Sequence, residues 1–215
     1  MVELLPYADD FLKGFYTTVV INVLAGILSI LVGFSAALIA LSRFAVPRLI
    51  VRLYIEFMRG IPILILLFII YFVGPKAGFV LNSFTTGVIG LGLYNGAYVA
   101  EIIRANLLTI PKGQAEACSA LGIPKRYQFI RILLPQLLVS SIPSLTNQFI
   151  MMLKNSTVVS IITVGDLLAI AKMVVSESFS YIAPFFIISI VYWVLAYLLS
   201  LVGNRLENRL SAHLK

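Results

Sequence analysis

Residues 15–42 read FYTTVVINVLAGILSILVGFSAALIALS, and no charged side chain interrupts them. A helix that crosses a bilayer core about 30 Å thick needs roughly 20 mostly apolar residues, so this stretch is long enough to span a membrane. Three further uncharged runs also reach that length: Ala77 to Ala100, Ile132 to Leu153 and Ser178 to Asn204. A shorter run, Gly60 to Pro75, becomes long enough if the helix extends through Phe57 and Met58.

These runs predict an all-α membrane protein with five transmembrane helices in a single domain, residues 1–215. The composition agrees, because 60% of the residues are hydrophobic and only 12% are charged, about half the charged share of a typical soluble domain. We expect no signal peptide, since the first residues carry acids but no base. A barrel is not expected, because the runs lack polar–apolar alternation. The single cysteine, Cys118, excludes an internal disulfide.

The basic residues predict the orientation. Most of the 16 lysines and arginines fall on one side of the predicted membrane. That side holds Arg43, Arg48, Arg52, Arg59, Arg104, Lys112, Lys125, Arg126, Arg131, Arg205, Arg209 and Lys215. The positive-inside rule makes this side cytoplasmic, with the N-terminus outside and the C-terminus inside. Because topology explains these charges, which flank helices in short loops, no nucleic-acid partner is expected.

Polar residues within the apolar runs point to a pathway or to helix–helix contacts. Gly92 and Gly96 form a small-xxx-small pair that lets two helix backbones approach closely. The fourth run is rich in hydroxyls and amides, which face either a partner helix or a water-filled path. Glu101 and Arg104, three residues apart, share a helix face. Lys154 is either a functional charge inside the membrane or a side chain that snorkels to the headgroups.

The segment of about residues 110–131 predicts a short helix on the cytoplasmic face. Residues 116–121 are good helix formers, and Gly122 and Pro124 end the helix. Because this helix lies between two membrane helices, it is well placed to dock into another protein and to transmit a movement of that protein to both membrane helices.

This segment resembles the "EAA" loop of the permeases of bacterial ATP-binding-cassette importers. That pattern is Glu-Ala-Ala, three residues, Gly, nine residues and Ile-x-Leu-Pro; Glu116-Ala117, Gly122 and residues 132–135 match it, with Cys118 in place of the second alanine. The resemblance implies the type I importer permease fold (MetI-like) and a second permease copy or paralogue. It also implies docking on an ATPase subunit, and the residues it assigns to coupling are Glu116, Ala117, Cys118, Leu121, Gly122 and Pro135.

Other segments are similar to the polar amino-acid branch of these permeases. They are residues 54–62 (YIEFMRGIP), 96–104 (GAYVAEIIR), 111–114 (PKGQ), 147–150 (NQFI) and 153–157 (LKNST). One departure is Ile61, where that branch has threonine. The resemblance covers roughly residues 14 to 210 and implies transport of glutamine, cystine or basic amino acids. An extracytoplasmic binding protein would deliver the amino acid to a permease in the bacterial cytoplasmic membrane.

Seven residues are candidates for the substrate pathway: Asn95, Glu101, Asn147, Gln148, Lys154, Asn155 and Ser156. Lys154 could meet an α-carboxylate. No acid lies between Ile132 and Asp166, and a site for a cationic side chain would want one, so a neutral amino acid such as glutamine or cystine is favoured. Glu101, or an acid on a partner, leaves basic amino acids open. Residues 160–177 are expected to form a bent, partly extracellular gate segment.

The sequence predicts no catalytic role and no metal site for this chain. It lacks a Gly-Lys-Ser/Thr phosphate loop, so ATP and magnesium are expected on a separate subunit, and the chain needs no cofactor of its own. One histidine and one cysteine offer no nucleophile–base pair in the membrane. Three alternatives remain. The chain could be a permease for another small solute in the same superfamily, or a scaffold that forms the passive half of a heterodimer. It could also be an ATP-independent channel or carrier, which would have no need of the docking segment.

Overall fold

A computed structural model describes residues 2–211, and every regular element in this range is helical. The all-α prediction is therefore confirmed. The elements in chain order are η1 (Val2–Tyr7), α1 (Ala8–Ala40), α2 (Ala45–Gly60), α3 (Ile63–Phe68), η2 (Ile69–Val73), η3 (Gly74–Ala77), α4 (Ser83–Thr109), α5 (Lys112–Ala120), α6 (Lys125–Tyr127), η4 (Gln128–Leu133), α7 (Leu134–Asn155), η5 (Ser156–Ile162), α8 (Leu167–Ser178) and α9 (Ile182–Ser211).

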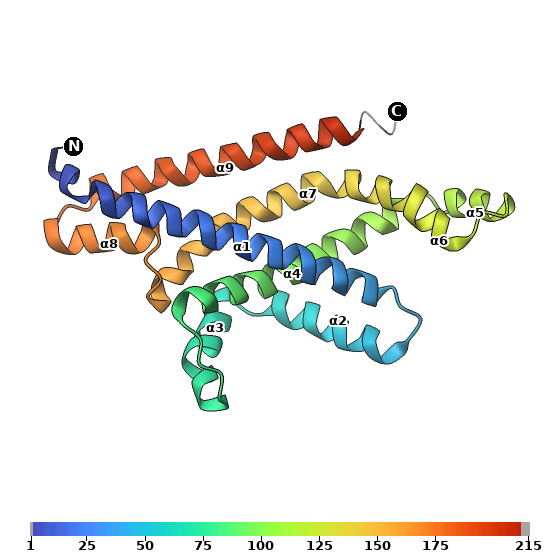
Figure 1. Ribbon diagram of the computed structural model, residues 1–215, viewed down its shortest axis with the longest axis horizontal. Coiled ribbons are helices and arrows are strands. Elements are labelled where there is room, and N and C mark those ends of the chain that lie inside the picture. Colours follow the sequence, from blue (N-terminus) through green and yellow to red (C-terminus); the bar gives the residue numbers. More distant parts are fainter. Residues whose placement is uncertain (1, 212–215) are drawn as a thin grey trace.

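The long helices run along one common direction, with α5 and α6 at one end of the molecule and α8 at the other (Figure 1). Three helical segments within residues 2–211 are long and apolar enough to cross a membrane: Leu5–Ala40, Lys125–Ile162 and Ile182–Ser211. They cover most of the first predicted run, all of the fourth and most of the last. The third run lies mostly in α4, which is not among these three. The count of five spans thus stays a prediction.

The second predicted run is interrupted. The two helical segments Ala45–Gly60 and Ile63–Ala77 meet at a bend of 108°, so that together they form at most one broken span. The expected extension of this run through Phe57 and Met58 is wrong, because these residues belong to α2, before the bend. The break follows from Pro62, which has no backbone N–H and whose ring disfavours a helical conformation for Ile61; Ile61 is indeed extended, with a ψ of 148°.

Helices α1 and α4 make the most extensive helix–helix contact of the molecule. A Cβ added to Gly33 of α1 would lie 2.6 Å from the Cβ of Val99 and 2.7 Å from the backbone oxygen of Gly96. At Gly92, on the facing side of α4, it would lie 2.5 Å from the Leu28 side chain. Only glycine permits these distances, so the predicted close approach of two backbones is confirmed at this pair of helices.

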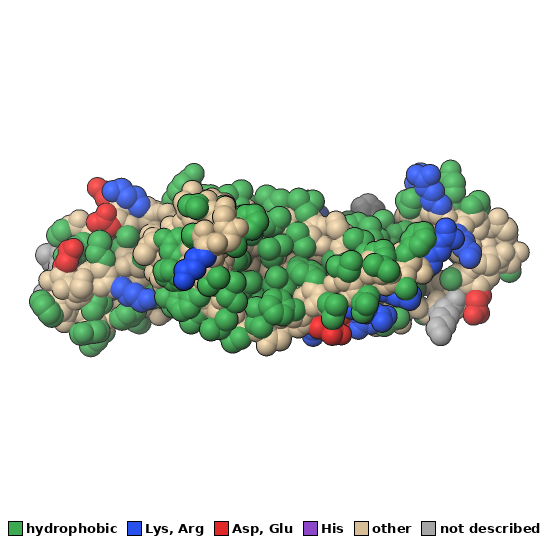
Figure 2. Space-filling model, turned by 90° about the horizontal axis from the view of Figure 1, so that it is seen from below, with side chains coloured by type: hydrophobic (Ala, Val, Ile, Leu, Met, Phe, Trp, Pro, Cys, Tyr) green, Lys and Arg blue, Asp and Glu red, His purple; other side chains and the backbone are tan. Residues whose placement is uncertain are grey.

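Two apolar clusters form the core around α4. One contains Ile21, Leu67, Leu91 and Ile162, and so joins α1, α3, α4 and η5. The other contains Ala37, Ile55, Ala100 and Leu137, and so joins α1, α2, α4 and α7. Many large apolar side chains stay exposed on the outside of the molecule, as the mostly hydrophobic face in Figure 2 shows. An exterior of this kind suits lipid or a partner protein rather than water.

The segment of residues 160–177 bends as predicted. η5 ends at Ile162, Thr163 has a positive φ of 66°, and α8 begins four residues later. Asp166 caps α8, because its Oδ1 accepts a hydrogen bond from the N–H of Ala169 at 2.9 Å. The Leu167 N–H donates to Oγ1 of Thr18 at 3.0 Å, which ties the start of α8 to α1.

Candidate functional site

The predicted docking helix is present as α5, and Gly122 ends it in a defined turn. Gly122 has a φ of 71°, a conformation that glycine adopts without strain. Its N–H donates to the Ser119 oxygen at 3.1 Å, and the Ile123 N–H donates to the Cys118 oxygen at 3.0 Å. These two bonds form a Schellman motif. The sequence prediction that Gly122 stops this helix is thus confirmed, with a specific backbone reason.

Side-chain hydrogen bonds hold α5 against the helix that follows it. The Nε2 of Gln136 donates to Oε1 of Gln114 at 2.7 Å. The Nε2 of Gln128 donates to the Ile123 oxygen at 2.8 Å and to Oγ of Ser119 at 3.2 Å. A displacement of α5 would therefore be transmitted directly to η4 and α7.

The six predicted coupling residues divide into an outer and an inner set. Cys118 is buried, so the small side chain at this position faces inward. Pro135 lies in the first turn of α7, directly after η4, where its missing N–H removes one backbone hydrogen bond from the continuous helical segment. The remaining four, Glu116, Ala117, Leu121 and Gly122, are exposed. Leu121 is a large apolar side chain with 78% of its surface exposed, and such a residue at a helix end is suited to a pocket on another protein.

Two of the predicted pathway residues meet inside the molecule. The Nε2 of Gln148 on α7 donates to Oδ1 of Asn95 on α4 at 2.8 Å. The Nδ2 of Asn95 in turn donates to the Leu91 oxygen at 2.8 Å. Asn95 is completely buried, while Gln148 is half-buried. The two amides therefore form a polar link between the central helix and α7, with the glutamine at its more accessible end.

The other predicted pathway residues on α7 and η5 lie apart from the Asn95–Gln148 link. Asn147 and Lys154 are exposed, and Asn155 is half-buried. Lys154 makes no ion pair with any described residue, so the two interpretations of its charge both stand. Ser156 is buried, and its Oγ accepts a hydrogen bond from Nδ2 of Asn22 on α1 at 2.8 Å.

Glu101 and Arg104 share a helix face, as their spacing predicts, and the structure shows that they form an ion pair there. The Nε and Nη2 of Arg104 donate to both carboxylate oxygens of Glu101 at 2.8 Å and 2.6 Å. Arg59, at the end of α2, approaches the same carboxylate at 3.7 Å, and its guanidinium lies 5.6 Å from the centre of the Tyr98 ring. Glu101, Arg104 and Arg59 line a cavity of about 320 Å³, whose walls also include Arg52 and Glu56 of α2.

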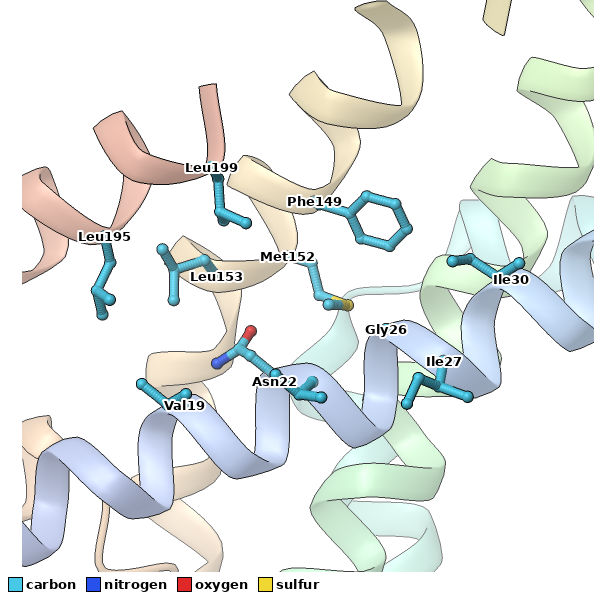
Figure 3. A pocket seen from close by; sticks show the side chains of 11 residues that line it. Val19, Asn22, Gly26, Ile27, Ile30, Phe149, Met152, Leu153, Leu195 and Leu199 are labelled. Carbon is cyan, nitrogen blue, oxygen red and sulfur yellow. The ribbon is translucent and has the colours of Figure 1, made fainter. Parts of the chain in front are cut away.

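A second cavity, of about 290 Å³, lies between α1, α7 and α9 (Figure 3). Its walls are apolar side chains such as Ile27, Phe149 and Leu199, and Asn22 contributes the one polar side chain of the lining. Such a lining suits hydrocarbon rather than a polar solute, so this cavity is not part of the candidate pathway.

Sequence reasoning missed two features of the site. The first is α2, whose residues appeared only as a basic segment after the first helix. The four-residue spacing of Arg48, Arg52 and Glu56 is the signal that could have revealed an amphipathic helix. The second is the pairing of Asn22 with Ser156, for which no local pattern exists, because the two residues are far apart in the chain.

Residues 29–212 match the family of binding-protein-dependent transport system inner membrane components. The chain belongs to this family. The match spans the exposed α5 segment, both amides of the Asn95–Gln148 link and the Glu101–Arg104 pair. It confirms the resemblance that the residues of the docking segment suggested.

Curated relatives cover nearly the whole permease. The probable amino-acid ABC transporter permease protein YckA of Bacillus subtilis (strain 168) is 34% identical, over 97% of this chain and 91% of the relative. The putative glutamine transport system permease protein GlnP of Rickettsia typhi is 34% identical, over 98% of this chain and 97% of the relative. The L-cystine transport system permease protein TcyB of Bacillus subtilis is 34% identical, over 93% of this chain and 86% of the relative.

Solved structures share the fold of the permease. A crystal structure of an amino acid ABC transporter with histidines is 34% identical and has a TM-score of 0.91, covering 97% of each chain. An inward-facing MetNI methionine ABC transporter is 20% identical, has a TM-score of 0.81, and covers 96% of this chain and 98% of its own. The predicted MetI-like fold of a type I importer permease is thus confirmed.

Proposed function

We propose that this permease is one half of a membrane-spanning pair in an ATP-driven importer of polar L-amino acids. The observation that carries this proposal is the hydrogen-bonded path from α5 through Gln114 and Gln136 into α7, the helix that also bears Gln148. A segment exposed for docking is joined in this way to an amide inside the helix bundle. The names of the curated relatives support amino acids as the substrate class.

The chain's part in this importer is mechanical. A separate ATPase subunit binds ATP with magnesium and receives α5 through Glu116, Ala117, Leu121 and the turn at Gly122, while Cys118 and Pro135 shape the segment from within. Closure of the ATPase dimer brings the two α5 helices together. The pair then switches between two packings of the same helices, which is alternating access.

A neutral polar amino acid, such as glutamine or cystine, is the substrate that the pathway suits best. Among the predicted pathway residues, the side-chain groups of Asn95, Gln148, Asn155 and Ser156 are neutral, and exposed Lys154 could attract a carboxylate. Both oxygens of Glu101 accept hydrogen bonds from Arg104, so this acid is not free for the side chain of a basic substrate. The ion pair between Glu101 and Arg104 therefore favours a neutral substrate over arginine or lysine.

The permease lies in the bacterial cytoplasmic membrane, with its N-terminus outside and α5 at the cytoplasmic face. In this orientation α8 lies at the outer end, where a soluble binding protein delivers the amino acid. The distribution of basic residues supports the orientation, and the family description supports an inner membrane.

The test is ATP hydrolysis by the importer in liposomes, reconstituted with its ATPase subunit and binding protein, across a panel of amino acids. Stimulation by one or a few neutral polar amino acids is expected. If no amino acid stimulates an intact complex, the substrate is another solute. A Gly122→Leu variant separates the importer from a channel, because the substitution should abolish ATP-linked uptake but would leave a passive channel conducting.

A further inference from the structure

Helix α2 carries a stripe of charged side chains along one face. Arg48, Arg52, Glu56 and Arg59 are spaced four, four and three residues apart, so they stack on the same side of a helix. Ile55, which is 6% exposed, lies on this same side and packs into the core, whereas the opposite side of α2 carries exposed apolar side chains such as Leu53 and Phe57. Figure 2 shows acidic and basic side chains gathered beside apolar ones on the lower face of the molecule, where α2 lies.

Part of this stripe lines the cavity between α2 and α4, which we call the α2–α4 cavity. Its walls are Ala40 of α1, Arg52, Ile55, Glu56 and Arg59 of α2, and Glu101 and Arg104 of α4. Its volume of about 320 Å³ lies at the lower end of the range for small-molecule sites, roughly 300–1,000 Å³. Charges of both signs from two helices thus face a space large enough for a small ligand.

The charged side chains of this cavity differ in whether they already have an ion-pair partner. Glu101 and Arg104 neutralise each other through two hydrogen bonds. Arg59 reaches Glu101 only at 3.7 Å. Neither Arg52 nor Glu56 forms an ion pair with a side chain that the structure describes, although their four-residue spacing would allow one between them. The charges of Arg52 and Glu56 are therefore available to a ligand, and Arg59 keeps further N–H donors beyond its one contact with Glu101.

This arrangement matches a small zwitterion. A guanidinium group presents donors in a planar fork that suits a carboxylate or phosphate, and Glu56 could accept hydrogen bonds from a primary ammonium group. We propose that the α2–α4 cavity binds a ligand that carries one anionic oxygen group, held by Arg52 and Arg59, and one ammonium group, held by Glu56.

Two sources can supply this chemistry. One source is a free α-amino acid that leaves the transport pathway, and this possibility rests on the proposed function. The other source is the headgroup of phosphatidylethanolamine, and this possibility is independent of the proposed function. In both cases the ligand occupies a site separate from the Asn95–Gln148 link.

The experiment measures binding of radiolabelled L-glutamine to the complex of permease and ATPase subunit. The complex is held in nanodiscs made either of phosphatidylcholine alone or with added phosphatidylethanolamine. The variants are Arg52→Gln and Glu56→Gln, and the matched control is Arg48→Gln, on the same stripe but outside the cavity. Size-exclusion chromatography confirms that each variant assembles. Native mass spectrometry counts the phosphatidylethanolamine that stays bound.

If a free amino acid is the ligand, glutamine binds in phosphatidylcholine alone. Loss of one charge-assisted hydrogen bond then weakens this binding about tenfold or more in each cavity variant, and not in the control. If the headgroup is the ligand, both cavity variants lose the retained phosphatidylethanolamine, and glutamine binding does not depend on them. Either result supports the site and names its occupant.

The proposal is overturned if both cavity variants keep wild-type glutamine binding and lipid retention. It is also overturned if Gln148→Ala alone abolishes glutamine binding and the lipid count stays unchanged, because the ligand then lies in the transmembrane pathway. The lipid count does not depend on any transported substrate. If no amino acid stimulated ATP hydrolysis by the importer, the phosphatidylethanolamine count would therefore still test whether the α2–α4 cavity binds a ligand.

Discussion

Gln148 on α7 donates a hydrogen bond of 2.8 Å to the side-chain oxygen of Asn95 on α4, which is completely buried. This bond joins two amides that are 53 positions apart in the chain. A buried amide oxygen that loses its donor costs about 1–3 kcal/mol. The bond is therefore a point at which both stability and transport respond to a single substitution.

We predict that Gln148→Ala lowers the free energy of unfolding in detergent by about 1–3 kcal/mol and also impairs uptake. The matched control is Asn147→Ala, because Asn147 is the exposed neighbour on the same helix and makes no side-chain hydrogen bond in the described chain. Its unfolding should stay within about 0.5 kcal/mol of the wild type. Equal destabilisation by both variants would show that the Asn95 contact is not the cause.

A second prediction concerns the contact between α1 and α4. Gly33→Ala should be strongly destabilising, because the new methyl group would lie 2.7 Å from the Gly96 backbone oxygen, which cannot move without shifting α4. Gly26→Ala is the control on the same helix, since its nearest neighbour is the flexible Met152 side chain at 3.5 Å. Thermal unfolding of the two variants tests this, and a Gly26 variant as unstable as the Gly33 variant would contradict it.

A third prediction separates conformation from crowding at the end of α5. Nothing lies within 4 Å of a Cβ added to Gly122, so the cost of a side chain there comes from its φ of 71°. Gly122→Ala should cost about 1 kcal/mol in that turn, and Gly122→Asn less. ATP-driven uptake should fall in the same order. Gly113→Ala, in the same helix with nothing within 4 Å and no positive φ, is the control. Equal activity of Gly122→Ala and the wild type would disprove this explanation.

A fourth prediction concerns acid stability. Asp166 lies outside the three spanning segments, and burial raises its pKa from 3.8 to about 6, although Lys172 and backbone N–H groups oppose the shift. Between these values the folded chain binds more protons than the unfolded chain, so this group makes the protein more stable as the pH falls from about 7 to about 5.

Asp166→Asn should remove this pH dependence while keeping the cap of α8, because asparagine is an equally good N-cap. At about pH 7 the variant should be the more stable protein, since it buries no charge. Asp166→Ala is the control, because it also removes the charge but loses the cap, at about 1 kcal/mol. Denaturant unfolding at both pH values measures the effect, and an unchanged profile in Asp166→Asn would assign the dependence to another group.

The sequence predicts best what depends on neighbouring residues. The stop at Gly122 and the helix face shared by Glu101 and Arg104 both follow from spacing within a few residues. It also names Asn95 and Gln148 as candidates, but not their contact, because this depends on how α4 and α7 cross. The angle of the bend after Gly60 is not predictable from the sequence, since Pro62 interrupts a helix without setting the direction in which the chain continues. The unpaired state of Arg52 and Glu56 is not foreseeable, because their spacing would equally allow an ion pair.

The 38-residue helical segment from Lys125 to Ile162 is about 57 Å long, at the rise per residue of an α-helix. Gln148 attaches it to α4 closer to its Ile162 end than to its Lys125 end. The same segment also packs into the core through Leu137 and Met152, so contacts on both sides of Gln148 hold it in place. A movement that α5 receives at one end must therefore shift the segment against all of these contacts before it reaches Ser156 and α8 at the other end.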